Sequence, residues 1–100
     1  MKRHSIPYLK TDSEGYVLNG LWKFVKVNGE YRWIEAGLGG GGHQDLVDDD
    51  ETAESAGTVF IFRDYWRMYG SYSTYLSVGC KGGEYKEITE MLDRPHDDGY

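Results

Sequence analysis

The chain has 100 residues, one cysteine and a net charge of −6 at neutral pH. This length fits a single domain spanning residues 1–100, and one cysteine excludes an intramolecular disulfide and a multi-cysteine zinc site. No run approaches the roughly 18 apolar residues of a membrane-spanning helix, the N-terminus carries no secretory signal, and the cysteine usage is typical of a reducing compartment. We therefore predict a cytoplasmic protein that does not enter the membrane.

Acidic residues are concentrated in two segments. Residues 43–57 hold six acids and no base, and residues 84–100 hold six acids and two bases, whereas the rest of the chain is mildly basic. This layout argues against a uniform nucleic-acid-binding surface. It permits an acidic patch that meets a basic partner.

Aromatic residues make up 15% of the chain, and most of them are tyrosine. Tyrosine and tryptophan favour strands, and a flat sheet can carry such rings on both faces. A surplus of these rings on a small domain is also typical of a surface that contacts a partner. The candidate contact residues are Trp22, Trp33, Tyr65, Trp66, Tyr69 and Tyr72.

The first residues predict only weak structure. Pro7 limits residues 1–10 to an edge strand or an extended arm. A short strand is predicted at Tyr16–Leu18, before the turn residues Asn19-Gly20.

Leu21–Ala36 carries the clearest signal, a β-hairpin with Asn28-Gly29 as its turn. Asn and Gly tolerate the positive φ that a type I′ turn requires at both central positions. A two-residue loop places Val27 opposite Glu30, Phe24 opposite Trp33, Lys26 opposite Tyr31 and Trp22 opposite Glu35. We predict that the face with Trp22, Phe24 and Trp33 is buried, although a register slip by one residue would reverse the two faces.

A second hairpin is predicted from Thr58–Tyr69 and Tyr72–Val78. The run TVFIF is apolar on both faces, which indicates a strand in the middle of the sheet. Gly70-Ser71 suits a II′ turn, which would pair Tyr69 with Tyr72. A helix over residues 63–69 is the alternative, because aromatic residues there also follow helical spacing.

The C-terminal segment Glu84–Asp93 predicts a helix. Tyr85, Ile88, Met91 and Leu92 form one apolar stripe, and Pro95 ends the pattern before a frayed tail at residues 95–100. Together these segments predict an α+β fold, in which a small antiparallel sheet of four to five strands, built from two aromatic hairpins, packs one face on this helix.

Gly37–Gly57 is predicted to be a mobile, Gly-rich acidic loop between the two hairpins. Its four glycines lack the Lys-Ser/Thr of a phosphate-binding loop, and its acids do not follow the calcium-loop pattern, so we expect no cofactor and no metal. Such an acidic loop could bind a basic surface, either as a mimic of a phosphate backbone or as a protein contact. The candidate partner-binding residues are Asp45, Asp48, Asp49, Asp50, Glu51 and Glu54.

Catalysis has one weak candidate, a Cys80 nucleophile with His4, His43 or His96 as its base. Lys81 and a following helix N-terminus would lower the pKa of the thiol if the geometry held. A lone cysteine at a strand end is more typical of a small apolar side chain. We therefore predict that the chain is not an enzyme.

The sequence thus favours a small acidic binding protein without catalysis, for example an inhibitor or antagonist that engages a basic surface of another protein or of a nucleic-acid-binding complex. The alternative is a single-stranded nucleic-acid-binding module. In it, basic residues of the strands lie between aromatic rings, and those rings stack on nucleotides. The bases concerned are Lys23, Lys26, Arg32, Arg63 and Arg67. The sequence identifies neither the partner nor the oligomeric state, monomer or homodimer.

Overall fold

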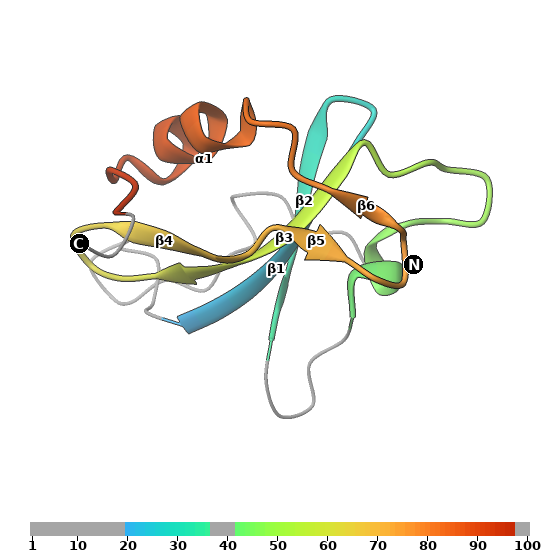
Figure 1. The fold of residues 1–100 in the computed structure, drawn as a ribbon, viewed down its shortest axis with the longest axis horizontal. Coiled ribbons are helices and arrows are strands. Elements are labelled where there is room, and N and C mark those ends of the chain that lie inside the picture. Colours follow the sequence, from blue (N-terminus) through green and yellow to red (C-terminus); the bar gives the residue numbers. More distant parts are fainter. Residues whose placement is uncertain (1–19, 37–41, 98–100) are drawn as a thin grey trace.

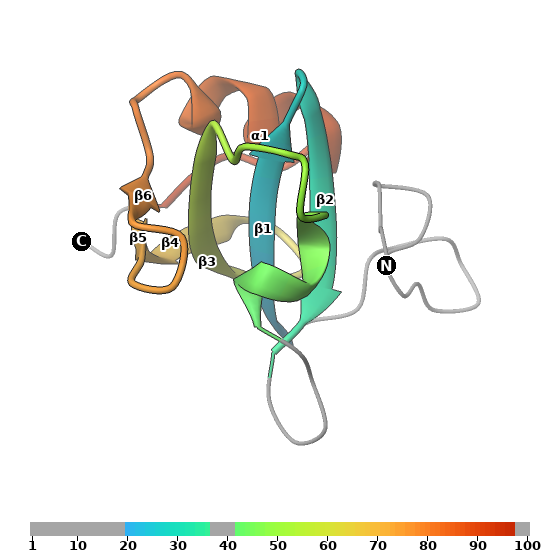
Figure 2. The same cartoon turned by 90° about the vertical axis from the view of Figure 1, so that its right-hand side faces the viewer.

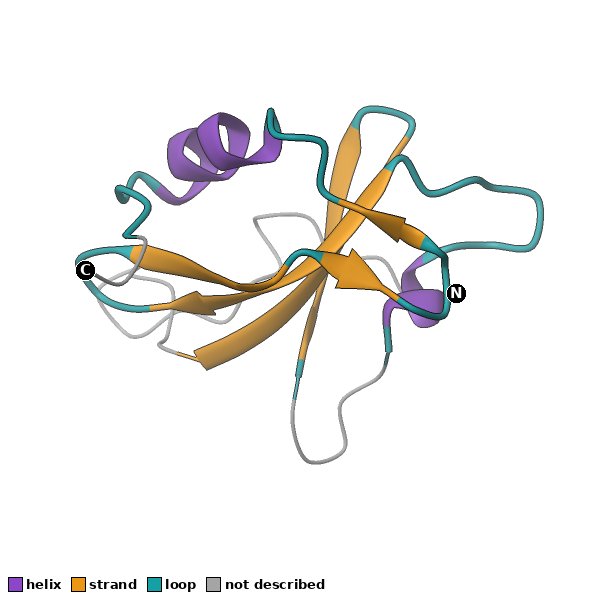
Figure 3. Cartoon of the chain, in the orientation of Figure 1, coloured by secondary structure: helices purple, strands orange, loops and turns teal. Residues whose placement is uncertain are grey.

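A computed structural model gives the fold, and it describes residues 20–36 and 42–97. Their elements (Figures 1 and 3) are β1 Gly20–Val27, β2 Glu30–Glu35, the 3-10 helix η2 His43–Leu46, β3 Ser55–Ile61, β4 Trp66–Gly70, β5 Tyr72–Ser73, β6 Val78–Gly79 and the α-helix α1 Glu84–Leu92. A four-stranded antiparallel sheet, a separate two-stranded sheet and one C-terminal helix confirm the α+β prediction. The predicted strand at Tyr16–Leu18 lies outside the described residues.

The first hairpin forms as predicted. Asn28 and Gly29 both adopt positive φ, at 53° and 77°, as a type I′ turn requires. Val27 pairs with Glu30 and Phe24 with Trp33 in the expected register.

The four-stranded sheet has the order β2-β1-β3-β4. Strand β3 therefore lies between two neighbours, as its apolar sequence predicted. Its pairing with β4 is interrupted between Thr58 and Val59, where the register shifts. This irregularity gives β4 one extra residue, Tyr69, which pairs with no residue of β3.

The predicted second hairpin is wrong. The chain reverses at residues 62–65, where the Phe62 N–H donates to the Tyr65 carbonyl at 2.8 Å, and β4 then pairs with β3. Gly70-Ser71 does not form a hairpin turn, because β5 pairs instead with β6 and Tyr72 lies opposite Gly79. Residues 66–70 are a strand, so the alternative of a helix over residues 63–69 is wrong as well.

One face of the large sheet packs against α1. The helix contributes Ile88 and Leu92 to a cluster with the aromatic face of the first hairpin, and Tyr85 and Met91 pack against that cluster, as the apolar stripe predicted. The sheet residues of this cluster are Trp22, Phe24, Tyr31, Trp33, Val59, Ile61 and Trp66. In the described part of the chain, no helix combines the length and apolarity that a membrane crossing needs.

The opposite face of the sheet holds a second cluster. Val25 and Val27 alternate along β1 with the residues that face α1, so their side chains point to the other side. They cluster with Leu46 of η2 and Ala56 of β3, and Leu76 and Val78 from the β5–β6 hairpin pack against the cluster. Both faces of the first hairpin are therefore covered, and Figure 2 shows η2 and the β5–β6 hairpin at the same end of the molecule.

The C-terminal residues line the outer edge of β4. Trp66 forms a parallel bridge with His96. The Trp66 N–H donates to the Pro95 carbonyl at 3.0 Å, and the Asp97 N–H donates to the Trp66 carbonyl at 2.8 Å. These contacts cover backbone groups that an edge strand would otherwise expose.

Gly57 allows a close approach of three strands, and this predicts a large effect of a single methyl group. A Cβ at Gly57 would lie 2.8 Å from the Phe24 ring and 2.9 Å from the Gly70 carbonyl oxygen, whereas a Cβ at Gly20 would meet nothing closer than 3.6 Å. We expect Gly57→Ala to lower the free energy of unfolding by about 1–3 kcal/mol. Urea unfolding measures the change.

The matched control is Gly20→Ala, which we expect to change the free energy of unfolding by no more than about 1 kcal/mol, and upward if the unfolded chain loses entropy. Equal losses in the two variants would contradict the packing argument.

Candidate functional site

The candidate site is the acidic segment, residues 42–54, which holds all six acids proposed from the sequence. The segment contains η2, and the strand that follows it begins at Ser55, so the predicted loop Gly37–Gly57 includes two elements that its composition did not indicate. Within the segment, some acids bind the protein itself and others face outward.

Glu51 is the acid that binds the sheet most extensively. Its carboxylate accepts hydrogen bonds from both terminal nitrogens of Arg32, at 2.7 and 2.8 Å. Arg32 is only 3% exposed and also donates to the Leu46 carbonyl at 2.9 Å. The hydrogen bond to Glu51 is the main cause that raises the pKa of Arg32, against the cost of burial. A paired, buried guanidinium thus fixes both η2 and the following turn to β2.

Two further acids bind backbone groups. Glu54 accepts a hydrogen bond from the Gly29 N–H at 2.7 Å, at the turn of the first hairpin. Asp45 accepts one from the Gly42 N–H at 2.9 Å, at the start of η2. These two carboxylates therefore bind the protein itself, although exposed residues surround them.

His43 attaches η2 to β3. Its Nε2 lies 2.7 Å from the Gly57 carbonyl oxygen, so the ring nitrogen donates to that oxygen. Burial lowers the pKa of His43, and the positive charge of Lys23 lowers it further, although the hydrogen bond to Gly57 acts in the opposite direction. The neutral imidazole is thus the form that fits this position.

The tip of the acidic segment presents the remaining acids. Asp49 and Asp50 are exposed, and the Glu51 N–H donates to the Asp48 carbonyl at 3.0 Å across them. The Asp48 N–H donates in turn to the Glu51 carboxylate at 2.9 Å. The same carboxylate that binds Arg32 therefore also shapes the turn that displays Asp49 and Asp50.

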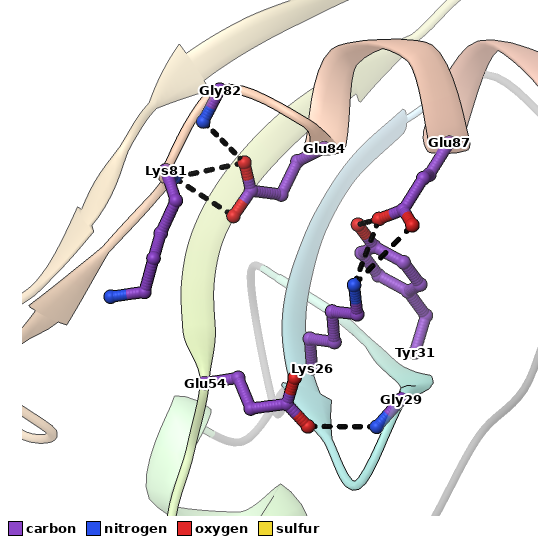
Figure 4. A network of polar contacts seen from close by, with 8 residues as sticks. All are labelled: Lys26, Gly29, Tyr31, Glu54, Lys81, Gly82, Glu84 and Glu87. Atoms are coloured by element: carbon purple, nitrogen blue, oxygen red, sulfur yellow. Dashed lines mark hydrogen bonds and ion pairs between the residues drawn. The ribbon is translucent and has the colours of Figure 1, made fainter.

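A separate polar network joins α1 to the first hairpin (Figure 4). The Tyr31 hydroxyl donates to Glu87 at 2.6 Å, and Lys26 Nζ donates to the same carboxylate at 3.0 Å. Glu87 has a lowered pKa because of these two donors, burial and Glu87 raise the pKa of Tyr31, and Glu87 raises the pKa of Lys26. None of the three groups is therefore poised to exchange protons near neutral pH, and the network serves as a tether.

Glu84, the first residue of α1, binds the backbone just before the helix. It is 4% exposed, and its carboxylate accepts hydrogen bonds from the backbone N–H groups of Lys81 and Gly82 at 2.7–2.9 Å (Figure 4). Burial opposes its ionisation, but these backbone donors outweigh burial and hold the pKa of Glu84 below its ordinary value.

Cys80 does not have the environment of an activated thiol. Burial, and then the charge of Glu84, raise its pKa to about 11, whereas the sequence had suggested that Lys81 and a helix N-terminus could lower it. Its Sγ lies 3.6 Å from the Ala56 carbonyl oxygen. His43 binds Gly57, and the His96 ring packs against Trp66 and Tyr85 at centroid distances of 4.6 and 4.7 Å.

The proposed aromatic contact surface needs correction. Trp22, Trp33 and Trp66 are 4%, 0% and 0% exposed and belong to the core beneath α1, because the strand alternation that places one of these rings inward places the others inward too. Tyr65 is partly covered by its contact with Phe62. Among the described residues the most exposed rings are Tyr69, Tyr72 and Tyr75. No periodic pattern marks Tyr75, which lies in the β5–β6 turn.

The bases of the nucleic-acid alternative have partners within the chain. Lys26 pairs with Glu87, Arg32 with Glu51, and Arg67 with Asp97 at 3.1 Å. Neither Lys23 nor Arg63 is without a partner. Single-stranded nucleic-acid binding stays a prediction, although these cations are engaged and the tryptophans are buried.

Comparison of the chain with protein-family models, with curated proteins and with solved structures gave no match. Among residues 20–36 and 42–97, no group of three or more His, Cys, Asp or Glu side chains has an arrangement that could hold a metal ion.

The Arg32–Glu51 pair predicts a strong dependence of stability on one carboxylate. Glu51→Gln removes the bidentate partner of the buried Arg32 and leaves it only the more exposed carboxylate of Glu30, at 3.2 Å, so we expect the free energy of unfolding to fall by about 3 kcal/mol. Glu87→Gln is the control, because the side chains of Lys26 and Glu87 are 22% and 44% exposed, and we expect it to cost about 1 kcal/mol or less. Urea unfolding of both variants tests the ranking, which equal costs would refute.

His43 predicts a pH dependence of stability. Its pKa in the folded chain lies below the ordinary 6.5, so the unfolded chain binds more protons in weak acid. The stabilisation is complete above pH 6.5 and is lost as the pH falls from 6.5 through the folded pKa. Glu84 and Glu87, with pKa values lowered from 4.5, lose their contributions only at lower pH.

Thermal unfolding between pH 8 and pH 5 measures this effect. We expect the melting temperature to fall as the pH drops below 6.5, and His43→Gln, which keeps a side-chain donor but does not titrate, to show a flatter profile. An identical slope in the variant and the wild-type chain would assign the pH dependence to other groups.

Proposed function

We propose that this chain is a small acidic binding protein without catalysis of its own, which acts as an inhibitor or antagonist by engaging a basic surface of another protein. Asp49 and Asp50 are the central contact residues, and the rest of the acidic segment supports them. We also propose a cytoplasmic location, in keeping with the single cysteine.

The observation that carries this proposal is the way Glu51 binds Arg32. In a free acidic loop, like charges repel one another and the loop loses conformational entropy when it binds. Here a buried arginine attaches the turn to the sheet, so Asp49 and Asp50 are exposed on a turn that is held in place. A preorganised pair of carboxylates binds a basic surface at a lower entropic cost than a flexible one.

The charge distribution supports the same proposal. The net charge is −6, and the described bases Lys26, Arg32 and Arg67 are paired with acids of the chain itself. A negative potential on one side of a small domain accelerates encounter with a positively charged partner and disfavours partners of like charge.

The test separates local charge from total charge. We expect Asp49→Asn/Asp50→Asn to weaken binding of a fluorescent octalysine peptide about fivefold at low ionic strength, since each exposed pair contributes roughly 0.2–1 kcal/mol. Fluorescence anisotropy of the full chain, repeated at several salt concentrations, measures the affinity and its salt dependence. The variant should also show the weaker salt dependence.

The control variant is Asp64→Asn/Glu90→Gln, which removes the same two charges from exposed positions outside the acidic segment. We expect it to bind octalysine within about twofold of the wild-type chain. If both double variants lose the same affinity, binding follows net charge alone and the acidic segment is not the site. A gel shift with single-stranded DNA at low salt tests the nucleic-acid alternative in parallel.

A further inference from the structure

Three tyrosines stand out on the surface. Tyr69 is 67% exposed, Tyr72 59% and Tyr75 79%. They lie at the end of β4, in β5 and in the turn between β5 and β6. Exposed tyrosines offer large, rigid contact areas at a low entropic cost, so their concentration on 7 successive residues of the chain marks a surface.

The β5–β6 hairpin has an inner and an outer side. Ser73 is buried and Val78, which pairs with it, packs against the second cluster. Tyr72 pairs with Gly79, and a Cβ at Gly79 would lie 3.0 Å from the Tyr72 ring. The glycine thus lets this ring lie against the backbone of β6, while the ring remains largely exposed.

The β5–β6 hairpin and the acidic segment pack against the same apolar cluster. Leu76 and Val78 of the hairpin pack against the same cluster as Val47 and Ala53 of the acidic segment, around the buried Leu46. Figure 2 shows the β5–β6 hairpin beside η2 at the end of the molecule that faces the viewer. The hairpin that carries Tyr72 and Tyr75 and the segment that carries Asp49 and Asp50 therefore pack on one apolar cluster on one face of the sheet.

The chain already binds its own cations in this manner. The Arg67 guanidinium lies 5.6 Å from the ring centroid of Tyr65 and 5.9 Å from that of Phe62, and it pairs with Asp97 at 3.1 Å. A ring and a carboxylate also hold a lysine, since Lys26 lies 5.5 Å from the Tyr31 centroid and pairs with Glu87 at 3.0 Å. A guanidinium differs because its plane stacks on the ring while its N–H groups bind oxygen.

From this juxtaposition we infer that Tyr72 and Tyr75 extend the acidic site and make it select arginine over lysine in a basic segment of the partner protein. The inference rests on the proposed function and adds the identity of the base that is recognised. A guanidinium is planar and more weakly hydrated than an ammonium, so stacking on a tyrosine favours arginine, whereas Asp49 and Asp50 attract both bases. Charge complementarity thus supplies attraction, and the rings supply selectivity.

The experiment compares octaarginine and octalysine peptides of equal charge, each labelled with the same fluorophore, on the full chain. We expect octaarginine to bind about fivefold more tightly, because a planar guanidinium stacks on a tyrosine ring whereas an ammonium does not. Tyr72→Leu/Tyr75→Leu should reduce octaarginine affinity about fivefold and leave octalysine affinity within twofold. Tyr72→Phe/Tyr75→Phe, which keeps both rings, should retain the preference, and Thr74→Ala in the same turn is the matched control.

The outcomes separate the two proposals. If neither peptide binds the wild-type chain at low salt, the proposed function fails and this inference fails with it. If both bind with equal affinity, or if the leucine variant weakens both peptides alike while it stays folded by circular dichroism, the proposed function stands and arginine selection is refuted.

Discussion

The Arg32–Glu51 ion pair is the interaction on which the arrangement of this molecule depends. Arg32 is buried opposite Val25, so its charge requires partners inside the protein. Glu51 supplies the closer and more buried partner, beside the more exposed Glu30 at 3.2 Å. One buried cation therefore allows η2 and the acidic turn to cover the second face of the sheet.

Local chemistry explains which parts of the fold were predictable. Asn28-Gly29 determined the register of the first hairpin because few residues adopt positive φ at both turn positions. The stripe from Tyr85 to Leu92 likewise predicted which side of α1 is buried. Gly70-Ser71 misled because its composition fits a hairpin turn, while the actual reversal at residues 62–65 contains no glycine. The choice between the two turns depended on tertiary pairing with β1, which no local pattern reveals.

The site was predictable in composition but not in orientation. The six acids were evident, yet nothing in their spacing showed that Glu51 faces inward while Asp49 and Asp50 face outward. One available signal was Arg32, a base opposite Val25 on the inferred strand face. The sequence places Trp22 and Trp33 both in the predicted core and on the predicted contact surface, and Trp66 on the contact surface alone, whereas all three are buried in the core.

The first hairpin carries an anchoring cation on each face, because Lys26 binds Glu87 of α1 and Arg32 binds Glu51. Its two strands contact each other over a short sequence separation, so it closes faster than the pairing of β1 with β3. We expect folding to begin there. The helix and the acidic segment then dock from later parts of the chain, each guided by opposite charge onto a hairpin that already presents both attachment points.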